Sequence, residues 1–262
     1  MKHNHVLQPG ELAFESLMAL PFLLAIIFYI ITALISNKGH KRWPFHRYFC
    51  WAIGILCAGT ALFGPIADSA HVDFTAHMMG HLLLGMLAPL LLALGAPMTL
   101  LLRTLSVVHA RRLSQVLKSW PVSFYSNPAF AALINIGGLW VLYATDLYML
   151  MLHNTLIHVV VHFHVFLAGY LFTISIIYID PIPHKYSFPF RAAVLILSLA
   201  AHGILSKYIY AHPPAYVPIK QAEWGGMIMY YGGDLVDIVL IFLFCRQWYQ
   251  AARPRDAVSI SQ

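Results

Sequence analysis

Histidine is the residue type with the clearest capacity for chemistry in this sequence. There are 15 histidines among 262 residues, and two pairs, His77/His81 and His158/His162, are each spaced four apart. Positions i and i+4 lie on one face of a helix, about 6 Å apart along its axis, so both imidazoles of a pair can reach one ion. If the two helices are neighbours, the four side chains make one site, and imidazole suits copper, zinc, iron and nickel. The alternative is that the pairs form hydrogen bonds within a helix bundle.

Methionine sharpens the choice of metal. Six methionines stand near the same end of the apolar segments as these histidines: Met78, Met79, Met149, Met151, Met227 and Met229. Thioether is a soft ligand, which favours Cu(I) over Cu(II). Methionine is also a common filler of apolar cores, and packing alone is the competing explanation.

Several other polar residues can extend or support such a site. His71 and Asp73 precede the first pair, and Asp73 can alternatively cap the helix that follows. Asp234 and Asp237 lie deep in the last apolar segment, where a carboxylate is a functional candidate by default. Asp234 can pair with His202 and fix its tautomer, or carry protons. The predicted metal ligands are His77, His81, His158 and His162, and the additional or supporting candidates are His71, Asp73, Met78, His202 and Asp234.

These residues must be positioned by membrane-spanning helices. The chain is 60% hydrophobic and 10% charged, whereas soluble domains carry about 25% charged residues. A spanning helix needs about 20 apolar residues. We therefore predict an all-α bundle of seven transmembrane helices in one domain, residues 14–250, between an extracytoplasmic segment 1–13 and a cytoplasmic tail 251–262. The apolar segments are 14–36, 48–66, 76–102, 129–148, 154–178, 190–210 and 224–246.

The distribution of lysine and arginine predicts the orientation. Of the 16 basic residues, 13 fall in alternate connections and at the C-terminal end; the others are Lys2, Lys207 and Lys220. Because cytoplasmic loops of membrane proteins are enriched in lysine and arginine, we expect the N-terminus outside and the C-terminus in the cytoplasm. This orientation puts both histidine pairs near the outer face. The basic residues are dispersed between apolar runs, so their charge does not indicate nucleic-acid binding.

Two stretches of the sequence resemble a known family. The run from His77 to His81, followed by Ala88-Pro89 and by Leu94-Gly-Ala-Pro97, is similar to the signature of the polytopic CtaG-type cytochrome c oxidase assembly factors. The segment from Gln221 to Met227 resembles the same family's last-helix motif. The resemblance covers residues 10–250. It implies a seven-helix protein of the bacterial inner membrane that serves oxidase subunits, and His77 and His81 are the best-matched metal ligands.

We therefore expect a non-enzymatic protein that binds copper on the outer side of the membrane and delivers it to a haem–copper oxidase. No nucleophile–base arrangement and no phosphate-binding glycine loop appears in the sequence. Three alternatives stay open: an electron carrier with haem b between paired histidines, a transporter of metal or protons past Asp234 and Asp237, and a scaffold without metal. A homo-oligomer is equally compatible with the sequence.

Overall fold

The computed structural model describes residues 9–182 and 184–253, and every regular element in these ranges is a helix. Five helical stretches are long and apolar enough to cross a membrane: Ala19–Gly39 within α1 (Pro9–Gly39), Phe74–Thr104, α11 (Thr155–Ile176), α12 (Phe188–Ala211) and Ile219–Ala252. The pair α9 (Pro128–Ala144) and α10 (Leu147–His153), bent by 78°, makes a sixth if it is one span. A polytopic all-α membrane protein is confirmed. The seventh crossing, which α2 (Phe45–Leu62) would supply, stays a prediction.

Two of the spans contain a π-helical turn. The first consists of α4 (Phe74–Leu82), η1 (Leu83–Leu87), α5 (Ala88–Leu94) and α6 (Pro97–Thr104). The second consists of α13 (Ile219–Met227), η2 (Ile228–Gly232) and α14 (Gly233–Ala252). A π-turn inserts extra backbone into a helix, shifts the faces of the residues after it, and is frequent at functional sites. Both π-turns lie next to polar residues that the sequence singled out.

Proline and glycine explain the shape of the first span. Pro89 lacks the N–H that would bond to the carbonyl of Gly85, and the π-turn ends at this point. α11 passes so close that a Cβ on Gly169 would collide with the carbonyl oxygen of Gly85. Ala96, in the left-handed conformation at φ 51°, then separates α5 from α6. The span is therefore bent and interrupted, and α11 is in backbone contact with its middle.

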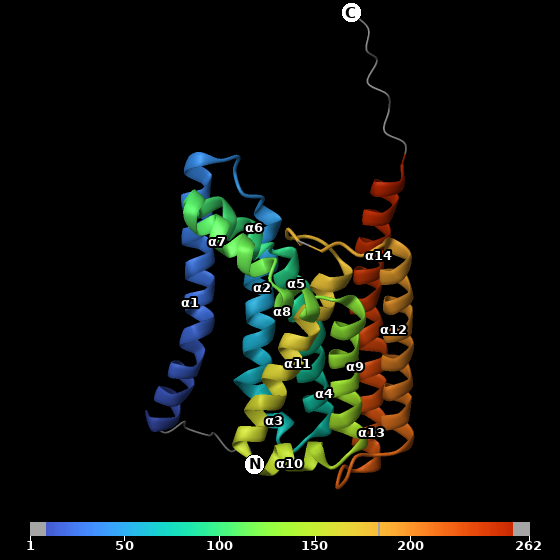
Figure 1. The fold of residues 1–262 in the computed structure, drawn as a ribbon. Helices are drawn as coiled ribbons and strands as arrows, with labels where there is room; N and C mark the ends of the chain where they lie inside the picture. Colours follow the sequence, from blue (N-terminus) through green and yellow to red (C-terminus); the bar gives the residue numbers. More distant parts are fainter. Residues whose placement is uncertain (1–8, 183, 254–262) are drawn as a thin grey trace, which may run out of the picture.

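The span Phe74–Thr104 is the most buried of the five. α11 packs against α9, α5 and η1, while α12 packs against α9 and α13 (Figure 1). α1 is peripheral and contacts α2 and α6. One core cluster fills the space between α4, α9, α10, α11, α12 and η2, and it contains Phe74, Met78, Tyr143, Tyr148, Met151 and Met229. The aromatic and methionine-rich half of the core thus surrounds the predicted histidine pairs.

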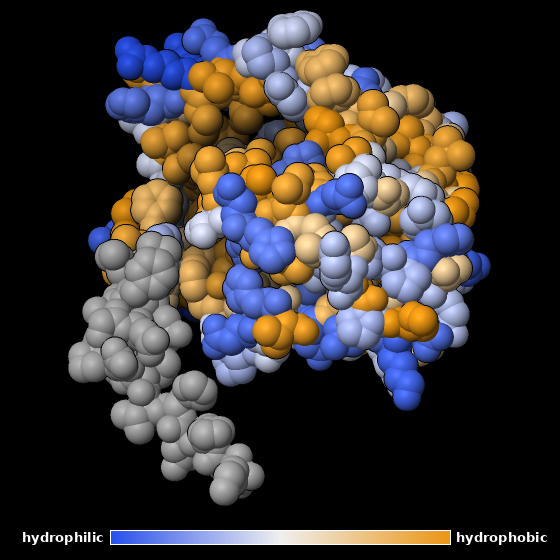
Figure 2. Space-filling view, turned by 90° about the horizontal axis from the view of Figure 1, so that it is seen from below, coloured by the Kyte–Doolittle hydropathy of each residue, from blue (hydrophilic) through white to orange (hydrophobic). Residues whose placement is uncertain are grey.

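The two ends of the bundle differ in their elements. α3 (Pro65–Ala70), α10 and the start of α4 lie at one end, which we call the histidine end (Figure 1). The opposite end, here the basic end, carries α6, α7 (Val107–Leu117), α8 (Trp120–Tyr125) and the end of α14. The surface of the histidine end carries both hydrophilic and hydrophobic residues (Figure 2). The connections predicted to be basic therefore share one end; which side of the membrane each end faces stays a prediction.

Candidate metal site

A row of imidazole rings runs inward from the histidine end. The ring of exposed His71 stacks on that of His158, with centres 5.1 Å apart. The His158 ring stacks on His162 at 4.1 Å. The His162 ring meets His77 edge to face at 6.3 Å, and His77 is only 6% exposed. These four residues, the histidine row, connect the surface to the buried core.

Helix caps place the row. The carboxylate of Asp73 accepts a hydrogen bond from the backbone N–H of Thr75 at 2.8 Å, so the N-cap role of Asp73 is confirmed. Asn154 caps α11 in the same way, accepting from Leu156 and Ile157. Both helices therefore begin at the histidine end, and both present histidine within their first turns.

Hydrogen bonds engage one nitrogen on each of two rings. The Nδ1–H of His162 donates to the carbonyl oxygen of His158 at 2.9 Å, since a carbonyl can only accept. Nε2 of His77 and the hydroxyl of Tyr143 share a hydrogen bond of 3.1 Å. Nε2 of His162 and Nδ1 of His77 remain for a ligand. This arrangement is typical of metal-binding histidines, whose second nitrogen is oriented by a neighbour.

The ring of His81 is not stacked in the row, although His81 lines one small cavity together with His77 and His162. Its ring faces His202 of α12, with centres 6.3 Å apart and planes 27° apart. In the part of the chain described here, no group of three or more histidine, cysteine, aspartate or glutamate residues is already placed to hold a metal ion. The shared four-nitrogen site therefore stays a prediction. Four residues advance a helix by about 6 Å and 40°, so the His81 ring lies deeper than that of His77 and turns toward α12.

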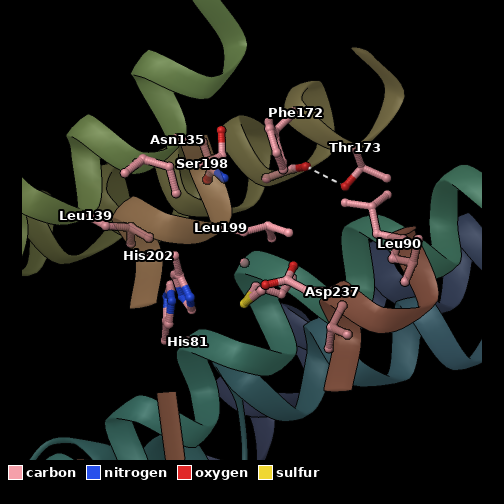
Figure 3. A pocket seen from close by; sticks show the side chains of 16 residues that line it. His81, Leu90, Asn135, Leu139, Phe172, Thr173, Ser198, Leu199, His202 and Asp237 are labelled. Atoms are coloured by element: carbon pink, nitrogen blue, oxygen red, sulfur yellow. Dashed lines mark hydrogen bonds between the residues drawn. The ribbon is translucent and has the colours of Figure 1, made fainter. Parts of the chain in front are cut away.

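The predicted pairing of Asp234 with His202 is not present in the described structure. Asp234 is exposed on the outside of α14, whereas Asp237 is 8% exposed and lines an internal cavity together with His81 and His202 (Figure 3). The π-turn η2 lies just before Asp234, and its extra residue changes which later positions face inward. The carboxylate that faces the cavity is therefore that of Asp237, about one helical turn after Asp234.

Sequence reasoning missed Tyr143 and placed Met78 among the candidates. Met78 is fully buried, and a Cβ on Gly225 would lie 3.1 Å from its Cγ, so Met78 fills the gap beside that glycine. Tyr143 comes from the end of α9, more than 60 residues from His77 in the chain. No spacing signal links them, and only the packing of α9 against α11 brings the hydroxyl to the row.

Comparison with known proteins adds a family. The family model for cytochrome c oxidase caa3 assembly factors matches residues 26–251. An uncharacterised protein of Mycobacterium leprae is 24% identical over 256 residues, which cover 90% of this chain and 39% of that protein. Uncharacterised proteins of Mycobacterium bovis and Mycobacterium tuberculosis are each 31% identical over 200 residues, covering 72% of this chain and 30% of theirs. The chain thus spans less than two fifths of these relatives. No solved structure shows a significant match.

Proposed function

The chain belongs to the cytochrome c oxidase caa3 assembly factor family, and from this premise we propose that it binds copper at the histidine row and passes it to the oxidase during assembly. The partners are copper as cargo and the oxidase subunits that receive it. The protein works in the bacterial cytoplasmic membrane, with the histidine end on the outer side because the basic end carries the lysine and arginine excess.

The observation that carries the proposal is the continuity of the histidine row. Successive ring centres are 5.1, 4.1 and 6.3 Å apart, from exposed His71 to buried His77. An ion bound by one ring is therefore only a few ångströms from the next, so it can move by exchanging one nitrogen ligand at a time. Structural packing alone does not require four imidazoles in sequence from the surface inward.

Cu(I) is the oxidation state that the surroundings favour. Imidazole binds copper. The buried Met151 and Met229 belong to the core cluster that contains Tyr143 and Tyr148, whose rings pack on His77. A monovalent ion costs less to bring into this apolar region than a divalent one, because the penalty for burying charge rises with the charge.

A copper-affinity measurement tests the proposal. The full chain is purified in detergent and titrated with Cu(I) in competition with a colorimetric Cu(I) chelator. We expect the double variant His77→Gln/His162→Gln to lose at least about 100-fold in affinity, since even residues that only orient metal ligands contribute about 10- to 100-fold. Cells that carry the variant should accumulate oxidase deficient in copper.

His164→Gln is the matched control. His164 lies on the same helix as His162 but on its exposed side, so its loss should leave the affinity unchanged. Wild-type protein that takes up no copper, or a double variant that binds as tightly as wild type, would refute the copper role and leave an assembly function without metal.

A further inference from the structure

A second set of polar groups lies beyond the row, in a cavity at the centre of the bundle. The cavity is formed by α4, η1, α5, α9, α11, α12 and α14, and its volume is about 40 Å³. Two of its hydroxyls are engaged within their own helices: Thr173 donates to the carbonyl of Gly169, and Ser198 donates to that of Val194, both at 2.8 Å. The polar side chains that remain are those of His81, His202, Asp237 and Asn135, which Figure 3 shows around the cavity.

The two histidines lack partners. His81 and His202 are 6% and 5% exposed, and Nε2 of each is buried without a hydrogen bond. Leaving a buried polar group unsatisfied costs about 1–3 kcal/mol, so such groups are rare in native proteins and call for an explanation. Metal–nitrogen bonds are about 2.0–2.1 Å long, so two imidazoles on opposite sides of one ion have ring centres about 6 Å apart. The observed separation is 6.3 Å.

A thioether reaches the same place. A Cβ on Gly233 would lie 2.6 Å from Cε1 of His202 and 3.7 Å from Cε of Met86, so both side chains meet over this glycine. Gly85 makes room for the other ring in the same way, since its Cβ would lie 3.3 Å from Cε1 of His81. Gly85 belongs to η1, and Gly233 directly follows η2. The two glycines, one in and one directly after a π-turn, thus leave the space that the imidazole rings occupy.

We propose that His81, His202 and Met86 form a second, inner Cu(I) site, with the carboxylate of Asp237 in the same cavity as the balancing charge. This inference rests on the proposed copper function and extends it to a place where the ion is held. Two imidazoles and one thioether are a soft ligand set that favours Cu(I). A carboxylate beside a monovalent ion makes the buried assembly neutral, which lowers the cost of burial.

Tyr143 links the row to the inner site. Its ring centre is 6.0 Å from that of His77 and 6.2 Å from that of His81. His77 and His81 are one helical turn apart on α4, so an ion released by His77 needs to advance by only about 6 Å to reach His81. The row is then the entrance, and the cavity is the holding site.

X-ray absorption of the full-length protein, loaded with Cu(I) without oxygen, tests the inner site. We expect Met86→Leu, which conserves side-chain volume, to lose the copper–sulfur scattering and to bind the inner ion about 10- to 100-fold more weakly. His202→Leu should bind one equivalent fewer than wild type. Met98→Leu is the matched control, because Met98 is half-buried like Met86 but does not line the cavity; it should retain both the sulfur signal and the stoichiometry.

The outcomes separate the two proposals. If His77→Gln/His162→Gln loses copper while Met86→Leu and His202→Leu behave as wild type, the inner site is overturned and the copper function stands. A wild-type protein without copper overturns both. Copper that stays bound through sulfur in the His77/His162 variant supports the inner site and refutes the row as a necessary entrance. A haem absorption band that disappears in His202→Leu would overturn the copper site in favour of haem ligation.

Discussion

The basic end and the centre of the bundle both bury polar side chains, but they treat the hydrogen-bonding groups differently. At the basic end Arg191 is 1% exposed, donates to the carbonyl of Ile176 at 2.6 Å, and has its guanidinium 4.0 Å from the Tyr178 ring centre and 4.4 Å from that of Phe188. Its Nε has no hydrogen-bond acceptor, but the aromatic faces stabilise the charge. In the centre, neither His81 nor His202 has such compensation for its buried Nε2.

Asp180 extends the contrast. Its carboxylate accepts from the backbone N–H groups of Met98 and Thr99 at 3.1 and 2.7 Å, and from the Thr99 hydroxyl at 2.6 Å, at the start of α6. Every one of these contacts ties one part of the chain to another. Polar groups at the basic end therefore stabilise the fold by joining separate parts of the chain. In the centre, the Nε2 atoms of His81 and His202 make no such bond and remain able to bind a ligand.

The largest expected effect is at Arg191. Arg191→Met removes a charged hydrogen bond, worth about 1.5–3 kcal/mol, and the contacts with the aromatic rings, so we expect about 3 kcal/mol of destabilisation. Thermal unfolding in detergent should show a midpoint lower by about 5–10 °C. Copper affinity of the folded fraction should be unchanged. If Arg191→Met lowered copper affinity without lowering the unfolding midpoint, Arg191 would not have the purely stabilising role that we assign to the basic end.

An intermediate effect is expected at Tyr143. Tyr143→Phe keeps the aromatic packing but removes the hydroxyl that orients Nε2 of His77, so copper affinity should fall by about 10- to 100-fold with little change in unfolding midpoint. The Cu(I) competition titration measures the first quantity and thermal unfolding the second. Tyr148→Phe is the control, because its ring packs on His77 with centres 5.0 Å apart and no hydrogen bond joins them in the described structure. Equal affinity losses in both variants would assign the effect to packing.

The smallest expected effect is on the stability of metal-free His202→Leu. Replacing a buried polar group that has no partner by an apolar one of similar size is close to neutral or stabilising. The unfolding midpoint of the copper-free variant should therefore match wild type within a few degrees or exceed it, although the variant should bind less copper. A strongly destabilised copper-free variant would place His202 with Arg191 among the residues that hold the fold.

The sequence was sufficient to predict the helical membrane fold, because each apolar segment has the length of a spanning helix and Asp73 has the position of a cap. It also identified His77 and His162, which the structure brings side by side. It could not predict that His81 faces His202, because this depends on the depth and rotation of three helices. The choice between Asp234 and Asp237 depends on a π-turn, for which residue spacing gives no signal. Met86 and Tyr143 carry no periodic pattern at all.

The contact between Gly169 and the carbonyl of Gly85 has a consequence for the histidines on the same helix. Gly169 lies two turns after His162 on α11, and any side chain at position 169 would push α11 away from η1. Such a displacement would tilt α11 and separate the His162 ring from His77. The absence of a side chain at position 169 therefore sets the alignment of the histidine row from a distance, and the tolerance of that alignment is no larger than a methyl group.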